Sequence, residues 1–500
     1  MSAAPSVVRA RTDEFDAVVA SRVGAGSRFA GLFGSAVDGG VRLVAALARQ
    51  DAMDAIETVV AGPPGTYPSV TVSVPAASWY EREIRDQFGL VPEGHPRPSG
   101  LVLPQGEGEG VARPNPGGIG ASAGIEPTER ALPAHVGGSG MFMIPYGPVR
   151  SGVFESVEYL VETPGEEIPH VRPRVFFKHR GIEKRFEGMV FDDAALLAER
   201  VEGVASVAHA LAFCQAVEGI AGVEVPQGAR LVRTVYAELE RIANHLDAAT
   251  RLAEPAGLAV AVARFSLHKE RVLRLVSRMC GSRFGRGVVV PGGVVAPPAL
   301  GPAELIDALG GLERGIRRDA DLLMETASFL DRLRGTGRLT PELARAHGTL
   351  GPIGRAAGLP EDVRASRRYA AYGELGVRSA PARPEGDALA RLWVRWDEIW
   401  GAFHLLRQAA DVLADRRAPR WRVAVPAEVG QGRGFGWAEA PQGEVLYLVE
   451  VQDGRVRRCK PRSASFHNLA LFPAVFRGDI LTDFAFIEAS FGLSIAGVAG

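Results

Sequence analysis

The chain has 500 residues, 46% of them apolar, so it can bury a large core and form more than one domain. Its net charge is near −1, which excludes the basic surface that nucleic-acid binding needs. The three cysteines, Cys214, Cys280 and Cys459, are too far apart for a metal-ligand or disulfide pattern, as expected in a reducing compartment. There is no apolar run of about 18 residues and no leader-like start, so we expect a cytoplasmic protein without a membrane span of its own.

Composition divides the chain into three parts. Residues 1–96 combine a helix-like stretch at 41–48 with a short alternating run at 71–74, which predicts a small α/β domain. Residues 97–137 are rich in glycine and proline and predict a flexible linker. The rest, 138–500, predicts a mainly α-helical domain with a flanking β-sheet. The fold class expected is therefore α+β.

The second domain predicts strands at both ends and helices between them. A strand pair is expected at 153–163 and 168–177, with Pro164-Gly165 as the turn. A long helical region follows at 192–335, opened by the acidic pair Asp192-Asp193. Near the end the chain returns to strands, with Asp453-Gly454 as a hairpin turn between the last two. These strands are expected at 421–425, 445–451 and 456–460.

A polar stripe interrupts the apolar segment 192–220. Glu199, Glu202, Ser206 and His209 follow offsets of 0, 3, 7 and 10, which would place them on one helix face. The next helix repeats the pattern with charged residues and a histidine at 0, 3 and 7: Glu238, Arg241 and His245. Such stripes are compatible with a buried polar site, and also with the solvated face of ordinary amphipathic helices.

One stretch of the first domain resembles a known family. Residues 79–89 (WYEREIRDQFG) and 93–96 (EGHP) resemble the signature of the 30 kDa subunit of respiratory complex I. In that family the element docks onto the partner large subunit and performs no chemistry. The same charges and rings would also make an ordinary packed edge. The docking residues implied are Trp79, Glu81, Arg82, Glu83, Asp86, Phe88 and Gly89.

The remainder, from about 141 to 500, resembles the 49 kDa subunit of complex I and the large subunit of group 4 [NiFe] hydrogenases. Both modules in one chain, in this order, resemble the fused large subunit of formate hydrogenlyase-type complexes. The matching motifs occur in the family's order: HRGIEK at 179–184, AERV at 198–201, ELER at 238–241, PGG at 291–293, EAP at 439–441 and RCK at 458–460.

The chain departs from the hydrogenase pattern at the metal ligands. The four cysteine positions of the family are held here by Glu202, Ala205, Ser494 and Gly497. Nickel and low-spin iron need soft thiolate ligands, so the resemblance implies no metal centre in this chain. The arginine that the family places over the metal is replaced by Gln442. Cys214 is expected to be a small buried apolar residue.

The complex I pattern is also incomplete. Complex I uses the emptied cavity for a quinone head group, with a histidine in a Gly-Pro-x-His-Pro loop. That loop reads Gly147-Pro148-Val149-Arg150-Ser151 here. The chain therefore looks like the energy-converting hydrogenase-related group, which keeps the hydrogenase framework without its cysteines and whose active site is unassigned.

The resemblance implies an electron-transfer role. The chain would hold no cofactor itself and would shape a redox cavity, for a quinone or another small molecule, beside a [4Fe–4S] cluster in a partner small subunit similar to the cluster N2 subunit of complex I. Membrane subunits that move ions would hold it against the inner face of the cell membrane. The acceptor, the ion and the direction of electron flow stay open. Candidate cavity residues are Glu183, Arg200, Glu202, His209, Gln442 and Asp483; an arginine beside a buried Glu202 would hold that carboxylate ionised.

Two other functions remain open. The chain could be a structural subunit whose cavity is closed by the apolar tail 484–500. It could also be a component of an NAD(P)H-linked dehydrogenase. For that function the only glycine-rich candidates are Gly24-Ala25-Gly26 and Gly118-Ile119-Gly120, and neither follows a clear strand.

Overall fold

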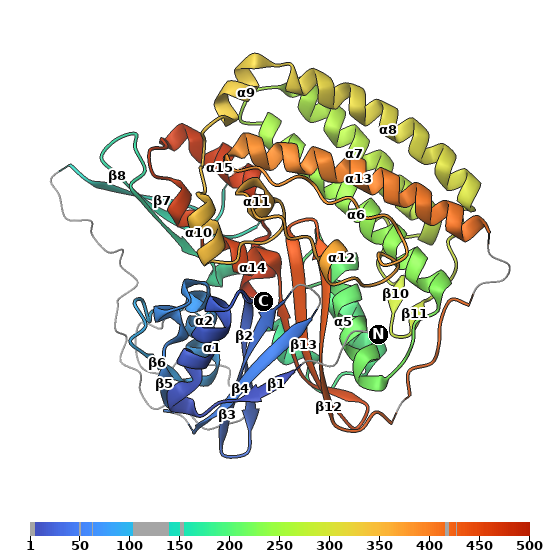
Figure 1. Cartoon of the computed structure of the whole chain (residues 1–500). Helices are drawn as coiled ribbons and strands as arrows, with labels where there is room; N and C mark the ends of the chain where they lie inside the picture. Colours follow the sequence, from blue (N-terminus) through green and yellow to red (C-terminus); the bar gives the residue numbers. More distant parts are fainter. Residues whose placement is uncertain are drawn as a thin grey trace.

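The computed structural model describes residues 6–49, 52–62, 64–103, 140–150, 155–415, 420–426 and 428–500 (Figure 1). Within these residues no helix is long and apolar enough to cross a membrane. The fold is α+β: a small N-terminal unit, drawn in blue, packs beneath a larger unit in which a layer of long helices covers a central sheet. Most of the segment predicted to be a linker, from residue 104 to 137, lies outside the described residues.

The N-terminal unit is built on a four-stranded sheet of order β1-β4-β3-β2, in which only the β1–β4 pair is parallel. Helix α1 (Phe15–Gly24) covers it, and helix α2 (Ser78–Phe88) lies between this sheet and the larger unit. A small parallel pair, β5 with β6, completes the unit. The strands are β1 (Val7–Arg9), β2 (Arg28–Val37), β3 (Gly40–Ala48), β4 (Met53–Ala61), β5 (Thr66–Pro68) and β6 (Val91–Glu93).

Three local predictions for this unit are wrong. The stretch 41–48 is strand β3, because it is buried between two neighbouring strands and the sheet overrides its helix-like spacing. The run 71–74 is not a strand: Val70–Val72 form a 3₁₀ turn whose free N–H groups donate to the Glu81 carboxylate. The linker cannot begin at 97, because the N–H groups of 101–103 donate to the Asp86 carboxylate.

Long helices dominate the larger unit. Helices α6, α7, α8 and α13 pack side by side as its upper layer in Figure 1. Shorter helices connect this layer to the sheets. The helices are α3 (Ile182–Phe186), α4 (Phe191–Ala198), α5 (Ser206–Ala221), α6 (Gln227–Ala253), α7 (Ala259–Cys280), α8 (Pro302–Met324), α9 (Ala327–Leu333), α10 (Pro341–Ala346), α11 (Gly351–Ala356), α12 (Val363–Ser366), α13 (Ala388–Ala414), α14 (Ala464–Leu469), α15 (Phe484–Phe491) and α16 (Ile495–Ala499).

A three-stranded antiparallel sheet of order β12-β13-β14 forms the centre of the larger unit. Helix α5 packs on it so closely that an ideal Cβ on Gly436 would lie 1.9 Å from the Ala212 carbonyl oxygen. Asp453 and Gly454 both adopt positive φ, as the predicted hairpin turn requires. The strands are β12 (Gly432–Ala440), β13 (Gly443–Gln452) and β14 (Arg455–Arg462).

A second antiparallel sheet, of order β7-β8-β9, lies at the edge of the larger unit beside the C-terminal segment. The predicted pair around Pro164-Gly165 is present as β8 and β9, and β7 was not predicted. Its strands are β7 (Phe142–Tyr146), β8 (Glu158–Thr163) and β9 (His170–Arg174), and a further short pair is β10 (Val289–Val290) with β11 (Gly293–Val294).

Two predictions for the larger unit need correction. The segment 192–220 is not one helix: α4 ends at Ala198 and α5 begins at Ser206, with a turn between them. Glu199 and Glu202 therefore do not share a helix face with His209. The segment 421–425 is not a strand of the sheet; only Arg422 forms an isolated bridge, to Gly293.

Candidate functional site

The turn between α4 and α5 meets helix α16, where Glu202 lies against Gly497; both are positions at which the family resemblance places hydrogenase cysteines. Arg180, from the HRGIEK motif, fastens the two segments. Its guanidinium donates to the carbonyl oxygens of Arg200 (2.9 Å) and Val201 (2.6 Å) in the turn and to that of Ala496 (2.9 Å) in α16. The motif thus sets the geometry of the site through its arginine.

Glu202 is the central side chain of this site and is fully buried. Its Oε1 accepts a hydrogen bond from Ser465 Oγ (2.8 Å), and its Oε2 lies 3.1 Å from Nε2 of His209. The carboxyl carbon lies so close to α16 that an ideal Cβ on Gly497 would be 2.8 Å away. The carboxyl group therefore occupies space between the two halves of the former metal site.

His209 joins this carboxylate to the central sheet. Its Nδ1 lies 2.8 Å from the hydroxyl oxygen of Tyr447 in β13, and the histidine is fully buried. An ionised Glu202 can only accept, so Nε2–H of a neutral His209 donates to it and the Tyr447 hydroxyl donates to Nδ1. The same contacts persist if Glu202 is protonated and donates to Nε2. The hydrogen bonds of this cluster can therefore run in either direction.

Ser494 and Ser465 close the site on the side of the tail. The N–H of Ser494 donates to Ser465 Oγ (3.1 Å), and Ser494 Oγ donates to Glu155 Oε1 (2.8 Å). Glu155 also accepts the N–H of Ile495, at the start of α16. The serines connect the tail to Glu202 through hydrogen bonds between buried groups.

The residues present do not fit a nickel–iron centre. Ala205 and Gly497 have no ligand atom, Ser494 Oγ is bonded to a carboxylate, and Glu202 is a hard oxygen donor already engaged with His209 and Ser465. None of the three cysteines lies at these positions. Cys214 and Cys459 are buried in apolar surroundings, where burial raises the pKa of each thiol well above its usual range.

Gln442 lies in the tight turn between β12 and β13. Its side chain is 97% buried, and neither its amide nitrogen nor its carbonyl oxygen has a hydrogen-bond partner among the described residues. A buried primary amide without partners is costly, because it loses its bonds to water without replacement. Gln442 therefore leaves two polar atoms free for a bound molecule or water.

Three predicted site residues, Arg200, Asp483 and Glu183, do not contact Glu202 in the structure. Arg200 is half exposed and pairs with Glu199 (3.5 Å), because the turn that separates α4 from α5 points it away from Glu202. Asp483 precedes α15 and pairs with Arg332 (3.1 Å). The expected arginine partner of Glu202 is thus absent from the described contacts, and its partners are His209 and Ser465.

Glu183 belongs to a separate buried cluster at the junction of the two units. It accepts from Lys460 Nζ (2.5 Å) and from Arg458, and Lys460 also pairs with Glu83 of α2 (2.6 Å). Burial opposes ionisation of Glu183, but the nearby charges of Lys460 and Arg458 outweigh it and lower its pKa to about 2. This arrangement holds α2 against β14.

The residues predicted to dock divide into two groups. Trp79 packs edge-on against Phe466, Glu83 pairs with Lys460, and Phe88 lies beneath the Arg458 guanidinium, so these three contact the larger unit of the same chain. Glu81, Arg82 and Asp86 instead hold loops of the N-terminal unit. Gly89 ends α2 with a positive φ of 72°.

Sequence patterns did not identify Ser465, Tyr447 or Glu155 as site residues. Tyr447 lies in a predicted strand, but alternation does not show which face meets a helix. Ser465 and Glu155 are 263 and 47 residues from Glu202, and only the tertiary fold brings them near it. Of the glycine-rich candidates for a nucleotide, Gly24 ends helix α1 rather than following a strand, and 118–120 lies outside the described residues.

Comparison with known proteins agrees with this architecture. The profile of the respiratory-chain NADH dehydrogenase 30 Kd subunit matches residues 28–114. The profile of the 49 Kd subunit matches 257–429 and 420–499. Between them, residues 180–247 match the profile of the nickel-dependent hydrogenases. The fold and the site thus define a large subunit of the hydrogenase and complex I type with both modules in one chain.

Individual relatives define the family further. The membrane-bound hydrogenase subunit alpha of Pyrococcus furiosus is 30% identical over 69% of this chain and 84% of its own length. Formate hydrogenlyase subunit 5 of Escherichia coli is 28% identical over 85% of this chain and 75% of its own. The structure of the membrane-bound sulfane sulfur reductase, an archaeal respiratory membrane complex, includes a chain with a TM-score of 0.67 and 24% identity, covering 72% of this chain and 98% of that one. The chain belongs to the group 4 hydrogenase and complex I large-subunit family.

Proposed function

We propose that this chain is the large subunit of a membrane-associated oxidoreductase complex and shapes a redox cavity without a nickel–iron centre. The observation that carries the proposal is the buried cluster of Ser465, Glu202, His209 and Tyr447 at the former metal site. Its groups can hold and move a proton but cannot bind the metal pair. Gln442 supports a cavity that accepts a small molecule, because both of its polar side-chain atoms lack partners among the described residues.

The proposed partners follow from the family. A small subunit carrying a [4Fe–4S] cluster delivers or takes electrons, and membrane subunits that move ions anchor the complex at the inner face of the cell membrane. Relatives named as a membrane-bound hydrogenase subunit and as NADH-quinone oxidoreductase subunits support this assembly. The electron acceptor of the cavity is a quinone or another small molecule.

The test is to purify the intact complex and measure iron, acid-labile sulfide and nickel per chain together with electron transfer. We expect iron and sulfide in a partner chain, no stoichiometric nickel, and transfer of electrons to an added quinone or other small acceptor. One nickel per chain together with hydrogen uptake would overturn the proposal.

A structural role is the second candidate, and one contact favours it. Glu202 already lies against Gly497, so the tail helix closes part of the former metal site. In that case the complex assembles around this chain but no molecule enters the site. Density for a bound molecule beside Gln442 in an experimental map of the complex distinguishes the cavity from the filled site.

A further inference from the structure

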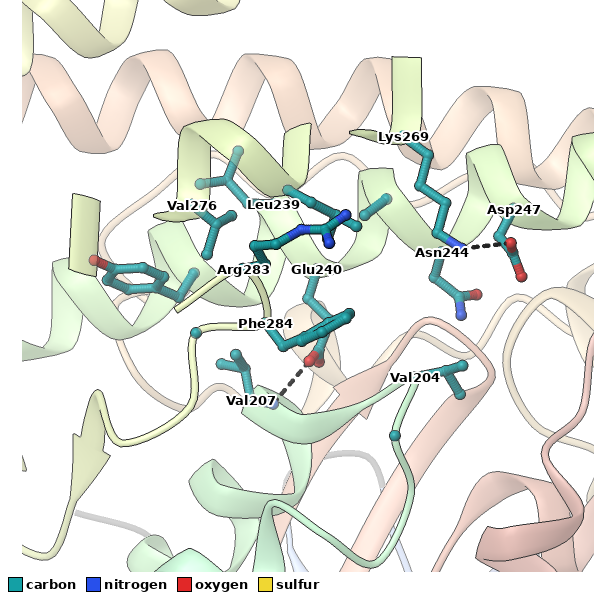
Figure 2. Close-up of a pocket in the computed structure, with 15 residues that line it drawn as sticks. Val204, Val207, Leu239, Glu240, Asn244, Asp247, Lys269, Val276, Arg283 and Phe284 are labelled. Carbon is teal, nitrogen blue, oxygen red and sulfur yellow. Dashed lines mark hydrogen bonds and ion pairs between the residues drawn. The ribbon is translucent and has the colours of Figure 1, made fainter. Parts of the chain in front are cut away.

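A cavity lies beside the turn that carries Glu202. It has a volume of about 80 Å³ and is bounded by this turn, by α6 and α7, and by the loop at 283–285 (Figure 2). Most of its wall is apolar. The residues whose side chains form this apolar wall are Val204, Val207, Tyr236, Leu239, Ala243, Leu273, Val276 and Phe284.

Glu240 is a partly buried charged group that lines this cavity. Figure 2 shows its carboxyl group directed toward the start of α5, where it accepts the N–H groups of Val207 (2.7 Å) and Ala208 (3.1 Å). His209, the partner of Glu202, follows in the same helical turn. Glu202 precedes the same end of α5, and its charge reaches Glu240.

The surroundings of Glu240 favour its protonated form. Desolvation has the largest effect, and the negative charge of Glu202 adds to it. The two N–H groups and the positive charge of Arg241 act in the opposite direction, and the net result raises the pKa of Glu240 to about 8. The other charged groups of the cavity wall are Lys269, Asp247 and Arg283.

The cavity offers a route for water from Glu240 to the surface. At its far end Lys269 Nζ pairs with Asp247 (2.6 Å), and both side chains are partly exposed. Asn244 lies between this pair and Glu240 in Figure 2. A void of about 80 Å³ exceeds the roughly 10–15 Å³ that one water needs by the same measure. It therefore has room for several waters between the carboxyl group and the ion pair.

We propose that Glu240 exchanges a proton with solvent through this cavity and that its charge is coupled to the Glu202 site, as a proton-loading group for the redox chemistry proposed above. An electron that arrives from the partner cluster adds negative charge beside Glu202. At about pH 8, where about half of the Glu240 groups are ionised, the Glu240 carboxylate then takes a proton from cavity water, with one oxygen forming O–H toward the cavity and the other still accepting from α5. When the electron leaves, the proton returns to the same water. The inference rests on the proposed function only for the source of the electron.

Infrared spectroscopy of the intact complex tests the site without turnover. We expect a protonated-carboxyl C=O band that disappears as pH rises through about 8, is missing in Glu240→Gln, and persists in the matched control Glu199→Gln. Glu199 is also buried and accepts a backbone N–H, that of Gly287, but does not line the cavity. Glu202→Gln should move the midpoint down by about half a pH unit or more, because it removes a negative charge. The proposal is overturned if the band is still present in Glu240→Gln. It is also overturned if the pH midpoint of the band is the same in Glu202→Gln as in the wild type.

One variant tests the cavity itself. Ala243→Leu fills the void, so the carboxyl band should exchange at least several-fold more slowly in deuterated water than in the wild type. Unchanged exchange would show that protons reach Glu240 by another route.

Melting temperature gives an independent check of the raised pKa of Glu240. Because the folded protein holds a proton that the unfolded chain loses above its usual pKa, wild type should lose stability relative to Glu240→Gln as pH rises from about 5 to 8.

The outcomes separate this inference from the proposed function. If the complex transfers no electrons, the proposed function fails, while the band, its response to Glu202→Gln and its exchange rate still decide the role of Glu240. If electrons flow and reduction of the complex raises the Glu240 band, the coupling is supported. If electrons flow and reduction leaves the band unchanged, the coupling is wrong although the proposed function stands.

Discussion

Two buried polar clusters in this protein each contain a glutamate, and the hydrogen-bond partners of the two glutamates differ in charge. Glu398 on α13 accepts from Arg355, from Arg241 (3.1 Å) and from His245 (2.8 Å), and all four side chains are fully buried. Among the described residues, Glu202, equally buried, has a serine hydroxyl and a histidine as side-chain hydrogen-bond partners, while the nearby Arg180 interacts with it through its charge alone. The same residue type is thus hydrogen-bonded to arginines in one cluster and to a serine and a histidine in the other.

The difference indicates different roles. Burial opposes ionisation of Glu398, but the arginines outweigh it and hold its pKa well below the usual range, while burial lowers the pKa of His245 to about 4. Neither group changes its proton near neutral pH, so this cluster joins α6, α11 and α13 without chemistry. The hydrogen bonds between Glu202 and His209 can run in either direction. We therefore assign structure to the first cluster and propose chemistry for the second.

The largest effect should come from breaking the Glu398 cluster. Glu398→Gln keeps the shape but leaves buried guanidinium groups without their counter-charge, so the variant should lose about 3–5 kcal/mol of unfolding free energy. Denaturant unfolding of the purified protein measures this loss. The control is Glu270→Gln, which removes an exposed pair with Arg274 and should cause no measurable shift. Equal stability of the two variants would remove the structural role of the first cluster.

Glu202→Gln should lower turnover strongly and stability only slightly, in contrast to Glu398→Gln. A glutamine cannot act as the proposed proton carrier, so turnover of the complex should fall by roughly 100-fold or more. Stability should change by only about 1 kcal/mol, because the amide still bonds Ser465. Turnover and melting of the same preparation measure both effects, with Glu199→Gln as the control. Unchanged turnover with intact assembly would make Glu202 a space-filling residue and favour the structural role.

Gly497→Ala tests how closely Glu202 and the tail helix α16 are packed. The added Cβ would lie 2.8 Å from the Glu202 carboxyl and 3.0 Å from Ser463 Oγ, so we expect a loss of about 1–3 kcal/mol from overpacking. Gly219→Ala is the matched control, because a Cβ there meets nothing within 4 Å. Thermal melts compare the two. A tolerated Gly497→Ala would mean that Glu202 moves aside easily and that the site can open.

The sequence predicted the family, the fold class and the order of the two units, because motifs such as HRGIEK and EAP are local and survive in linear order. It also located the Glu202–His209 pair, though by a periodicity that fails, since the helix breaks between the two residues. A contact 7 residues apart remained possible because the turn folds back on α5.

The sequence did not predict the side-chain contacts, because these depend on how the segments are oriented in the tertiary fold. The family resemblance placed Arg200, Glu183 and Asp483 near Glu202, but the first is half exposed and the others pair with Lys460 and Arg332. Strand β3 looked helical because the sheet around it, rather than its own pattern, decides its structure. The family's local sequence therefore predicts which segments meet, whereas the side-chain partners require coordinates.

The smallest effect is expected from Arg200→Ala, and it tests which arginine of this region matters. The Arg200 side chain is 51% exposed, and among the described residues it contacts Glu199 and the Leu196 carbonyl oxygen of α4, so the variant should stay within about 0.5 kcal/mol of wild type with unchanged turnover. Arg180→Ala is the variant to compare with it, because the Arg180 guanidinium joins the turn to α16 by donating to three carbonyl oxygens. Leaving these carbonyl groups without donors should cost about 1–3 kcal/mol and lower turnover by displacing the tail from Glu202. Equal effects of the two variants, measured by melting and turnover, would show that the charge of Arg200 reaches the site after all.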